Sequence, residues 1–195
     1  MKIQRELNNG EKIDVTINKQ LVENIKMYAN VTNEITKARL KEQIPLFSTS
    51  NIVGEWAELL VCDALKLVQQ PASKKDYDAE DQNGVKYQIK SRWYRSYLKE
   101  ECNRHGQEEF GSIDIDGKFN KLLLVYFEDD LSKPFRVLEV EKKNIEKLNE
   151  KKNKLFYKKK DKYAFHYCNS DSYNNKLATA VKDNLIKDIT KDYKW

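Results

Sequence analysis

The spacing of apolar residues along the chain predicts a series of helices and strands. Apolar positions three or four residues apart predict a helix over residues 19–40 and a second, well-packed helix over residues 54–68. A nearly continuous apolar segment at residues 121–128 is typical of a strand that is buried on both faces. Shorter apolar segments predict further strands at residues 135–140 and 164–168.

The last third of the chain adds two helices to this pattern. A short helix is expected around Ile145 and Leu148, and an amphipathic helix closes the chain with apolar residues at positions 177, 181, 185 and 189. The polar segment 93–110 fits either a helix or a loop. Taken together, the elements predict the α/β class, with a mixed β-sheet core flanked by helices.

The length and composition indicate one domain without a membrane anchor. A chain of 195 residues has the size of a single domain, here with an N-terminal helical addition over about residues 1–48 and a lysine-rich C-terminal part over about residues 141–195. The longest apolar run, residues 122–127, is much shorter than the roughly 20 residues that a membrane span needs. The first residues lack a secretory pattern and the three cysteines include no C-x-x-C pair, so we expect a cytoplasmic protein.

Positive charge is concentrated in one segment rather than spread over the chain. The whole chain carries a formal net charge of +5, whereas residues 141–162 alone contain ten lysines and four acidic residues. Such a segment suits contact with phosphate groups. It is equally compatible with a solvated lysine-rich face, and charge alone does not name a partner.

Residues 77–81 and 85–92 read as two strands on either side of Gln82-Asn83-Gly84, a strong signal for a β-hairpin. The loop can hold two residues or three. Glycine at the third loop position favours the longer loop, because this position takes the left-handed backbone conformation that glycine adopts without strain.

The length of this loop decides which residues face each other across the hairpin. A two-residue loop would place Asp78 opposite Ile89, whereas a three-residue loop places Asp78 directly opposite Gln88, with about 5 Å between their Cβ atoms. Side chains alternate along a strand, so Gln88 and Lys90 share one face.

These residues suit a magnesium site. Oxygen atoms of Asp78 and Gln88, with the backbone carbonyl of Ile89, are the type of ligand that Mg²⁺ prefers, and Lys90 would project beside the metal. Glu55, in the first turn of the second helix, is a second available carboxylate. The alternative is a surface hairpin on which Asp78 and Lys90 form an ordinary exposed ion pair of little energetic value.

The same residues resemble the PD-(D/E)XK nuclease superfamily in its glutamine variant, which occurs among type II restriction endonucleases. The resemblance covers roughly residues 51–127, and the segments that carry it are Gly54-Glu55 with Ala57-Glu58, Tyr77-Asp78, Tyr87-Gln88-Ile89-Lys90 and the apolar strand at residues 122–127. It implies a restriction-endonuclease-like fold, with Asp78 as the metal-binding aspartate, Gln88 at the position of a carboxylate, Lys90 as the catalytic lysine and Glu55 as the helix carboxylate.

Two features depart from the pattern of that family. No proline precedes Asp78, although this position is loosely defined in the family. Glutamine at position 88 removes one negative charge, which should weaken the affinity for the metal.

The activity that the resemblance implies is Mg²⁺-dependent hydrolysis of phosphodiester bonds in double-stranded DNA, most simply by a type II restriction endonuclease. A DNA repair or junction-resolving nuclease, or a non-catalytic nucleic-acid-binding protein on the same fold, is the alternative. A homodimer would suit cleavage of a palindromic site, because two-fold symmetry matches two-fold sites.

A basic and aromatic cluster directly follows the candidate lysine. Arginine can bind guanine or phosphate, so the candidates for DNA contact are Arg92, Trp93, Tyr94, Arg95 and Arg104. The alternative is that the aromatic residues pack in the core while the arginines are solvated.

Two further sets of residues are candidates for metal binding or for a structural role. Cys102, His105, His166 and Cys168 form a legitimate ligand set for structural Zn²⁺, although their spacing matches no strong signature. Asp114 and Asp116 come before the buried strand, where we expect them to cap a turn; a supporting role near the metal is the alternative.

Overall fold

The computed structural model of the chain describes residues 2–6, 12–16, 20, 27, 31, 52–70, 76–93, 107–127, 131, 133–150, 155–168 and 171–195. The side chains of residues 2–6, 12–16, 52, 55, 107–109, 167, 168 and 171 lie outside this description. The chain divides into two units, residues 1–46 and 47–195, which are described separately.

The first unit contains an antiparallel strand pair, β1 (Lys2–Glu6) and β2 (Lys12–Thr16). The hydrophobic pattern predicts only a helix in this region and misses the pair. Most of the predicted helix 19–40 lies outside the described residues. The three residues of it that are described, Gln20, Met27 and Val31, are helical and exposed.

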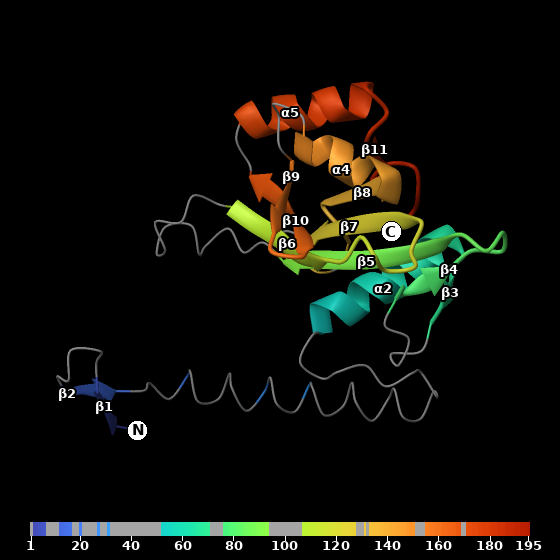
Figure 1. The fold of residues 1–195 in the computed structure, drawn as a ribbon. Helices are drawn as coiled ribbons and strands as arrows, with labels where there is room; N and C mark the ends of the chain where they lie inside the picture. Colours follow the sequence, from blue (N-terminus) through green and yellow to red (C-terminus); the bar gives the residue numbers. More distant parts are fainter. Residues whose placement is uncertain are drawn as a thin grey trace. The chain divides into compact units, whose positions relative to one another are not determined.

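The second unit is built around a six-stranded mixed sheet with the strand order β11-β8-β7-β5-β4-β3 (Figure 1). Its strands are β3 (Val68–Gln69), β4 (Ala79–Glu80), β5 (Lys86–Trp93), β7 (Lys121–Phe127), β8 (Arg136–Glu141) and β11 (Lys187–Asp188). Strands β5 and β7 are parallel, and the other neighbouring pairs are antiparallel. The predicted mixed sheet of an α/β protein is therefore confirmed.

Three helices and a second sheet cover this central sheet. Figure 1 shows α2 (Ile52–Leu65) on one face and α4 (Lys142–Glu150) with α5 (Asp171–Lys182) on the other. The second sheet has the order β6-β10-β9, formed by β6 (Gln107–Ile113), β10 (Lys162–Cys168) and β9 (Phe156–Lys159). The helix or loop predicted for residues 93–110 is wrong where the segment is described, because Trp93 ends β5 and residues 107–110 belong to β6. Residues 94–106 lie outside the description.

Strand β7 joins the two halves of the core, because its side chains alternate between two apolar clusters. Leu122, Leu124 and Tyr126 belong to the cluster shared with α4, α5 and the second sheet. Leu123 and Val125 belong to the cluster shared with α2. Every residue from 122 to 127 is buried, so the prediction of a strand buried on both faces is confirmed.

The hairpin of β4 and β5 has the three-residue loop that the sequence predicts. Ala79 pairs with Tyr87, and the amide of Asp81 donates to the carbonyl of Val85 over 3.0 Å. Gly84 has a φ of 78°, the left-handed conformation expected at the third loop position. The paired part of the hairpin ends at Ala79 and Tyr87, so the predicted pairing of Asp78 with Gln88 lies just beyond the last strand pair.

The second predicted helix ends earlier than the apolar pattern indicates. The prediction runs to residue 68, whereas α2 ends at Leu65 and Val68 begins a strand. Lys66 has a φ of 56°, and the amide of Leu67 donates to the carbonyl of Cys62 over 2.9 Å. This is the left-handed C-terminal cap that glycine usually provides, so lysine at this position is no obvious signal for the end of a helix.

The closing helix is also shorter than predicted. Helix α5 ends at Lys182, and Asn184 adopts a φ of 55° while the amide of Leu185 donates to the carbonyl of Ala180. Asparagine tolerates this left-handed position and so ends the helix. Leu185 and Ile189 therefore pack against the core from the segment that follows the helix rather than from the helix itself.

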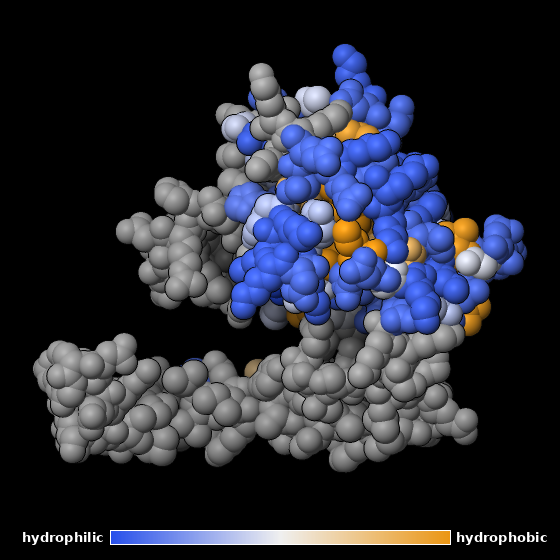
Figure 2. All heavy atoms as spheres, in the orientation of Figure 1, coloured by the Kyte–Doolittle hydropathy of each residue, from blue (hydrophilic) through white to orange (hydrophobic). Residues whose placement is uncertain are grey.

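Hydrophilic residues dominate the face of the described part that Figure 2 shows, with small apolar areas between them. One exposed apolar side chain, Trp56, is held in place by a hydrogen bond of 2.6 Å from its indole N–H to the carbonyl of Leu131. Within the part of the chain that the structure describes, no helix has the length and apolar character needed to cross a membrane.

Candidate nuclease site

A hollow of about 260 Å³ lies where α2, the hairpin of β4 and β5, and strand β6 meet. Charged side chains and two glycines line it: Glu58, Asp78, Lys90, Arg92, Gly54 and Gly111. Four of the predicted site residues, Asp78, Ile89, Lys90 and Arg92, thus line one hollow.

Asp78 lies where β4 ends and its backbone begins to separate from β5. Its amide donates to the carbonyl of Tyr87 over 2.8 Å, and its carboxylate oxygen Oδ2 accepts from the amide of Ile89 over 2.6 Å. The side chain of Asp78 therefore takes the place of a backbone partner along β5. Because the N–H and C=O groups of a strand residue point to the same edge, the carbonyl of Ile89 faces the edge where Asp78 lies.

The electrostatic state of Asp78 is set by two opposing influences. Burial raises the pKa of its carboxyl group above the usual value, while the hydrogen bond from Ile89 and the positive charge of Lys90 act in the lowering direction without cancelling the rise. The negative charge of Asp78 is thus only partly compensated within the protein. A cation in the hollow would supply the missing compensation.

Asp78 and Lys90 do not form the exposed ion pair that was the alternative interpretation. Both side chains are partly buried. No ion pair within 4.0 Å joins these two described residues, so Lys90 acts on Asp78 only through its charge at longer range. Its ammonium group remains free to interact with a bound molecule.

Gln88 is buried across the hairpin from Asp78, with only 8% of its surface exposed. Its side-chain oxygen Oε1 is buried and has no hydrogen-bond donor among the described residues. An acceptor left in this state costs about 1–3 kcal/mol. Gln88 is not among the described residues that line the hollow, so the structure does not bring this predicted ligand into it.

The helix carboxylate that reaches the hollow is Glu58. Its Oε2 atom accepts a hydrogen bond of 3.1 Å from the side-chain amide of Gln69 on β3. The side chain of Glu55, the residue predicted for this role, lies outside the described part of the chain. The sequence spacing is consistent with Glu58 at the hollow. Glu58 lies four residues after Gly54, which also lines the hollow, and residues at this separation share one face of a helix.

The thiol of Cys62 gives independent support for two carboxylates meeting here. Burial, followed by the charges of Glu58 and Asp78, raises the pKa of this buried thiol to about 12. Both carboxylates must therefore lie close to the same turn of α2. A thiol with this pKa stays protonated at neutral pH, which makes Cys62 a packing residue rather than a nucleophile.

The predicted DNA-contacting residues divide into two described and three undescribed positions. Arg92 is exposed and lines the hollow. Trp93 is partly buried and packs against the apolar cluster beneath α2, which corresponds to the core alternative. Tyr94, Arg95 and Arg104 lie outside the described residues.

The predicted zinc ligands are mostly outside the described residues. Cys102, His105 and the side chain of Cys168 are not described, and His166 is partly buried with its ring 6.4 Å from that of Tyr157. Among the described side chains, no group of three or more His, Cys, Asp or Glu residues converges in a way that could hold a metal ion.

The acidic pair before β7 caps a turn, as predicted. The carboxylate of Asp114 accepts from the amide of Asp116 over 3.0 Å, and its carbonyl accepts from the amide of Gly117. Neither aspartate lines the hollow described above.

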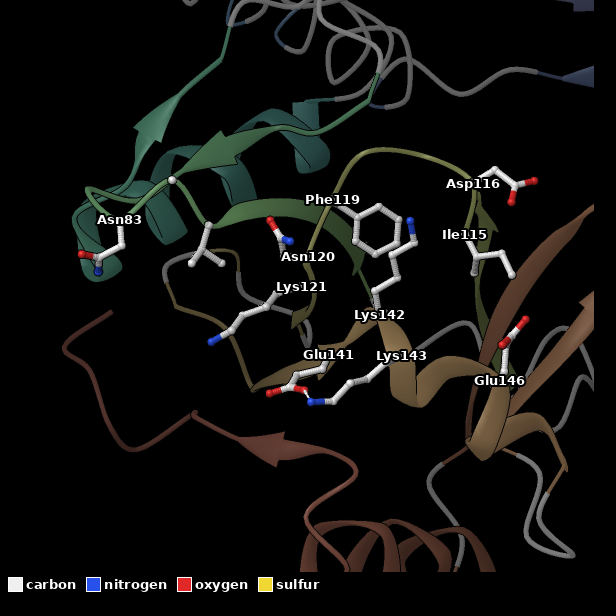
Figure 3. Close-up of a pocket in the computed structure, with 12 residues that line it drawn as sticks. Asn83, Ile115, Asp116, Phe119, Asn120, Lys121, Glu141, Lys142, Lys143 and Glu146 are labelled. Atoms are coloured by element: carbon white, nitrogen blue, oxygen red, sulfur yellow. Dashed lines mark ion pairs between the residues drawn. The ribbon is translucent and has the colours of Figure 1, made fainter.

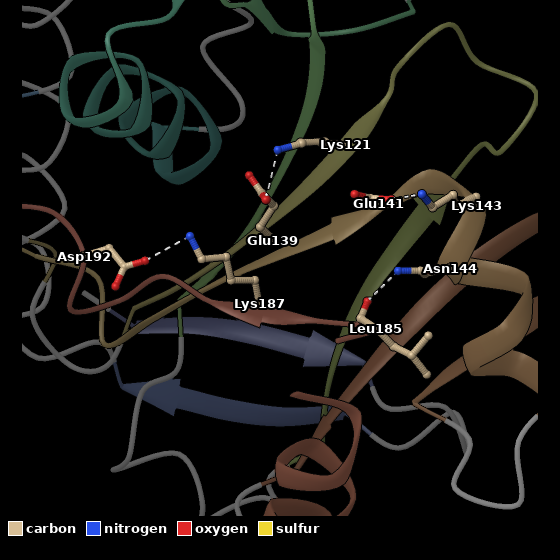
Figure 4. Close-up of polar contacts among 8 residues, drawn as sticks. All are labelled: Lys121, Glu139, Glu141, Lys143, Asn144, Leu185, Lys187 and Asp192. Carbon is tan, nitrogen blue, oxygen red and sulfur yellow. Dashed lines mark hydrogen bonds and ion pairs between the residues drawn. The ribbon is translucent and has the colours of Figure 1, made fainter. Parts of the chain in front are cut away.

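A larger hollow of about 950 Å³ lies at the opposite end of β5 and β7 (Figure 3). The lysines that line it already have partners within the protein. Lys121 pairs with Glu139 and Lys143 with Glu141 (Figure 4), while Lys142 donates to the carbonyl of Gly117 over 2.6 Å. This hollow therefore has little uncompensated positive charge to offer a ligand.

Comparison with known proteins does not assign this chain to a family. No protein-family model matches it, and no curated protein matches it at a significant level.

Proposed function

We propose that this chain is a Mg²⁺-dependent endonuclease of restriction-endonuclease-like fold that hydrolyses phosphodiester bonds of double-stranded DNA. One observation carries the proposal. Asp78 shares a single hollow with Lys90, with the backbone of Ile89 and with the helix carboxylate Glu58. This is the set of groups expected from the resemblance to the PD-(D/E)XK nucleases, with Glu58 in place of Glu55.

The candidate ligand atoms around Asp78 are oxygens, the type of ligand that Mg²⁺ prefers. The carboxylates of Asp78 and Glu58 and the carbonyl of Ile89 form an all-oxygen set at the hollow, which hard cations prefer. The charge of Asp78 is only partly compensated, and a divalent cation in the hollow would compensate it. Gln88, the fourth predicted ligand, does not line the hollow. The chemistry that bound Mg²⁺ supplies is a more acidic water and a polarised phosphate.

The roles of the protein groups follow from their positions. Asp78 is held to β5 through Ile89, so it presents its carboxylate in a fixed orientation. Lys90 has an ammonium group that can orient the attacking water and stabilise negative charge on the phosphate as it develops. Arg92, exposed beside the hollow, is placed to contact a neighbouring phosphate.

Within this chemistry we favour a type II restriction endonuclease, acting in the cytoplasm and as a homodimer on a palindromic site. The same constellation would serve a DNA repair or junction-resolving nuclease. One observation favours a non-catalytic DNA-binding protein instead: position 88 carries an amide rather than a carboxylate, and this amide does not line the hollow.

The test is cleavage of mixed plasmid DNA with and without Mg²⁺, followed by sequencing of the ends. Lys90→Ala should reduce the Mg²⁺-dependent rate by at least about 100-fold while DNA binding and thermal unfolding stay unchanged. Lys86→Ala is the matched control, because it removes the same charge from the same strand outside the hollow.

Cleavage by the Lys90→Ala variant at the normal rate would refute the mechanism. Ends that share one palindromic sequence support a restriction endonuclease, whereas ends scattered at branched or damaged DNA support the repair or junction-resolving alternative. Salt-dependent DNA binding without any Mg²⁺-dependent cleavage would indicate the non-catalytic protein.

A further inference from the structure

The hairpin that joins β9 to β10 concentrates lysine side chains at its tip. Residues 158–162 read Lys-Lys-Lys-Asp-Lys, and all five are exposed. We call this segment the lysine tip. Its four lysines and one aspartate give it a net charge of +3 within five residues, the highest local charge in the described part of the lysine-rich segment.

Two features of the lysine tip are unfavourable for folding. Lys159 and Lys162 are direct partners across the hairpin, and like charges at directly opposite positions destabilise a strand pair. Lys160 adopts a φ of 60°, a left-handed conformation that costs about 1–2 kcal/mol for a residue other than glycine.

The lysines of the tip differ from those elsewhere in the same segment. Lys142 and Lys143 each bind a protein group, the carbonyl of Gly117 and the carboxylate of Glu141. At the tip, Lys160 and Lys162 form no ion pair with any described residue within 4.0 Å. Lys160 and Lys162 therefore leave positive charge at the tip that is available to a partner.

The lysine tip is connected to the candidate nuclease site through strand pairing. Strand β10 runs from the tip along β6, where Tyr163 pairs with Ile113 and Phe165 pairs with Phe110. Gly111, which lines the hollow, lies in the bulge between these two pairs. The tip is thus about three residues along the strand from the hollow, or about 10 Å at a rise of about 3.3 Å per residue.

This distance suits a nucleic acid. Duplex DNA carries one negative charge for about every 1.7 Å of its axis, so a duplex bound at the hollow presents several more phosphates within about 10 Å. Lysine is a flexible point charge that contacts phosphate without reading bases. We propose that the lysine tip binds the phosphate backbone of duplex DNA next to the cleavage site; this inference rests on the proposed nuclease function for its choice of partner.

The experiment measures the affinity for a labelled DNA duplex at increasing salt concentration, by fluorescence anisotropy in EDTA so that cleavage does not interfere. The double variant Lys160→Ala/Lys162→Ala should lower the slope of log affinity against log salt by about 2, because each lysine–phosphate contact contributes about one counterion. The loss of affinity should be similar for duplexes of unrelated sequence. The matched control is Lys182→Ala/Lys191→Ala, which removes two exposed lysines from α5 and the C-terminal turn.

The outcomes separate this inference from the proposed function. A wild-type slope in the tip variant, an equal reduction in the control variant, or no DNA binding by the wild-type protein would each overturn the role of the tip. A reduced slope in a protein that cuts no plasmid with Mg²⁺ would uphold the tip and reject the nuclease. Thermal unfolding shows that the variant is folded, and its midpoint should not fall, because the substitution removes a pair of like charges.

Discussion

The carboxylate of Asp78 and the backbone amide of Ile89 are joined by a hydrogen bond of 2.6 Å, formed where the two strands of the hairpin separate. Through this bond, the side chain of Asp78 is fixed to the strand that carries Gln88 and Lys90. The register of the hairpin, which Gly84 sets, therefore determines the geometry of the candidate site. Folding and the proposed chemistry depend on the same three-residue loop.

The first prediction is that Asp78→Asn stabilises the protein at neutral pH while it abolishes the activity. Burial raises the pKa of Asp78 in the folded state, so the folded protein binds this proton more tightly than the unfolded chain does. Stability therefore falls as the pH rises from the unfolded value, near 3.8, through the raised folded value. An asparagine carbonyl can still accept from Ile89 without carrying the charge.

Thermal unfolding without divalent cations measures this effect. The midpoint of Asp78→Asn should exceed that of the wild type at pH 7, and the difference should disappear below about pH 4. Mg²⁺ at about one hundred times its dissociation constant should stabilise the wild type by about 2.7 kcal/mol and leave the variant unchanged. A variant that is less stable at pH 7 would mean that the Ile89 hydrogen bond outweighs the cost of burial.

The second prediction concerns the buried oxygen of Gln88. Gln88→Met has a similar volume and removes the acceptor that lacks a donor, so it should stabilise the metal-free protein by about 1 kcal/mol. It should also reduce the stabilisation that Mg²⁺ provides. Gln88→Glu should lower the stability of the metal-free protein, because the new carboxylate is repelled by Asp78. It should also increase the stabilisation that Mg²⁺ provides, because it adds a negatively charged oxygen ligand.

Denaturant unfolding with and without Mg²⁺ separates these expectations. The informative quantity is the gain in unfolding free energy on adding Mg²⁺, compared among the wild type and the two variants. An equal gain for the wild type and Gln88→Met would show that the glutamine is not a ligand, and the role of position 88 would then be structural.

Much of the fold could be predicted from the sequence because the signals were local. The apolar run of β7 is buried on both faces, and glycine at position 84 identified the length of the hairpin loop. The pairing of Ala79 with Tyr87 followed from counting residues away from that loop. No tertiary information was needed for these steps.

The errors arose where long-range packing or an unusual residue decided the structure. Lys66 ends α2 in a conformation that normally indicates glycine, so the helix was predicted too long. The presence of Glu58 at the hollow could not be predicted, because it depends on the rotation of α2 relative to the hairpin and so on how Ala57 and Val61 pack on the sheet. A strand as short as β3 has too few residues to give a periodic signal.

The last prediction tests Glu58 and the residue that positions it. Glu58→Gln removes a carboxylate from the hollow and should weaken the binding of Mg²⁺ or Mn²⁺ by about tenfold to 100-fold. Gln69→Met leaves the carboxylate in place but removes the 3.1 Å hydrogen bond that orients its Oε2 atom. Because Gln69 acts through Glu58, its substitution should weaken metal binding only when Glu58 is present.

A double-mutant cycle on metal affinity, measured by calorimetric titration, provides this readout. The double variant Glu58→Gln/Gln69→Met should bind metal no more weakly than Glu58→Gln alone, since coupled residues are not additive. A purely structural glutamine would instead lower the unfolding midpoint equally in both backgrounds and leave the metal affinity unchanged. Gln70→Met is the matched control, because Gln70 follows directly in the chain and its side-chain amide donates to the carbonyl of Val68 instead of to the carboxylate.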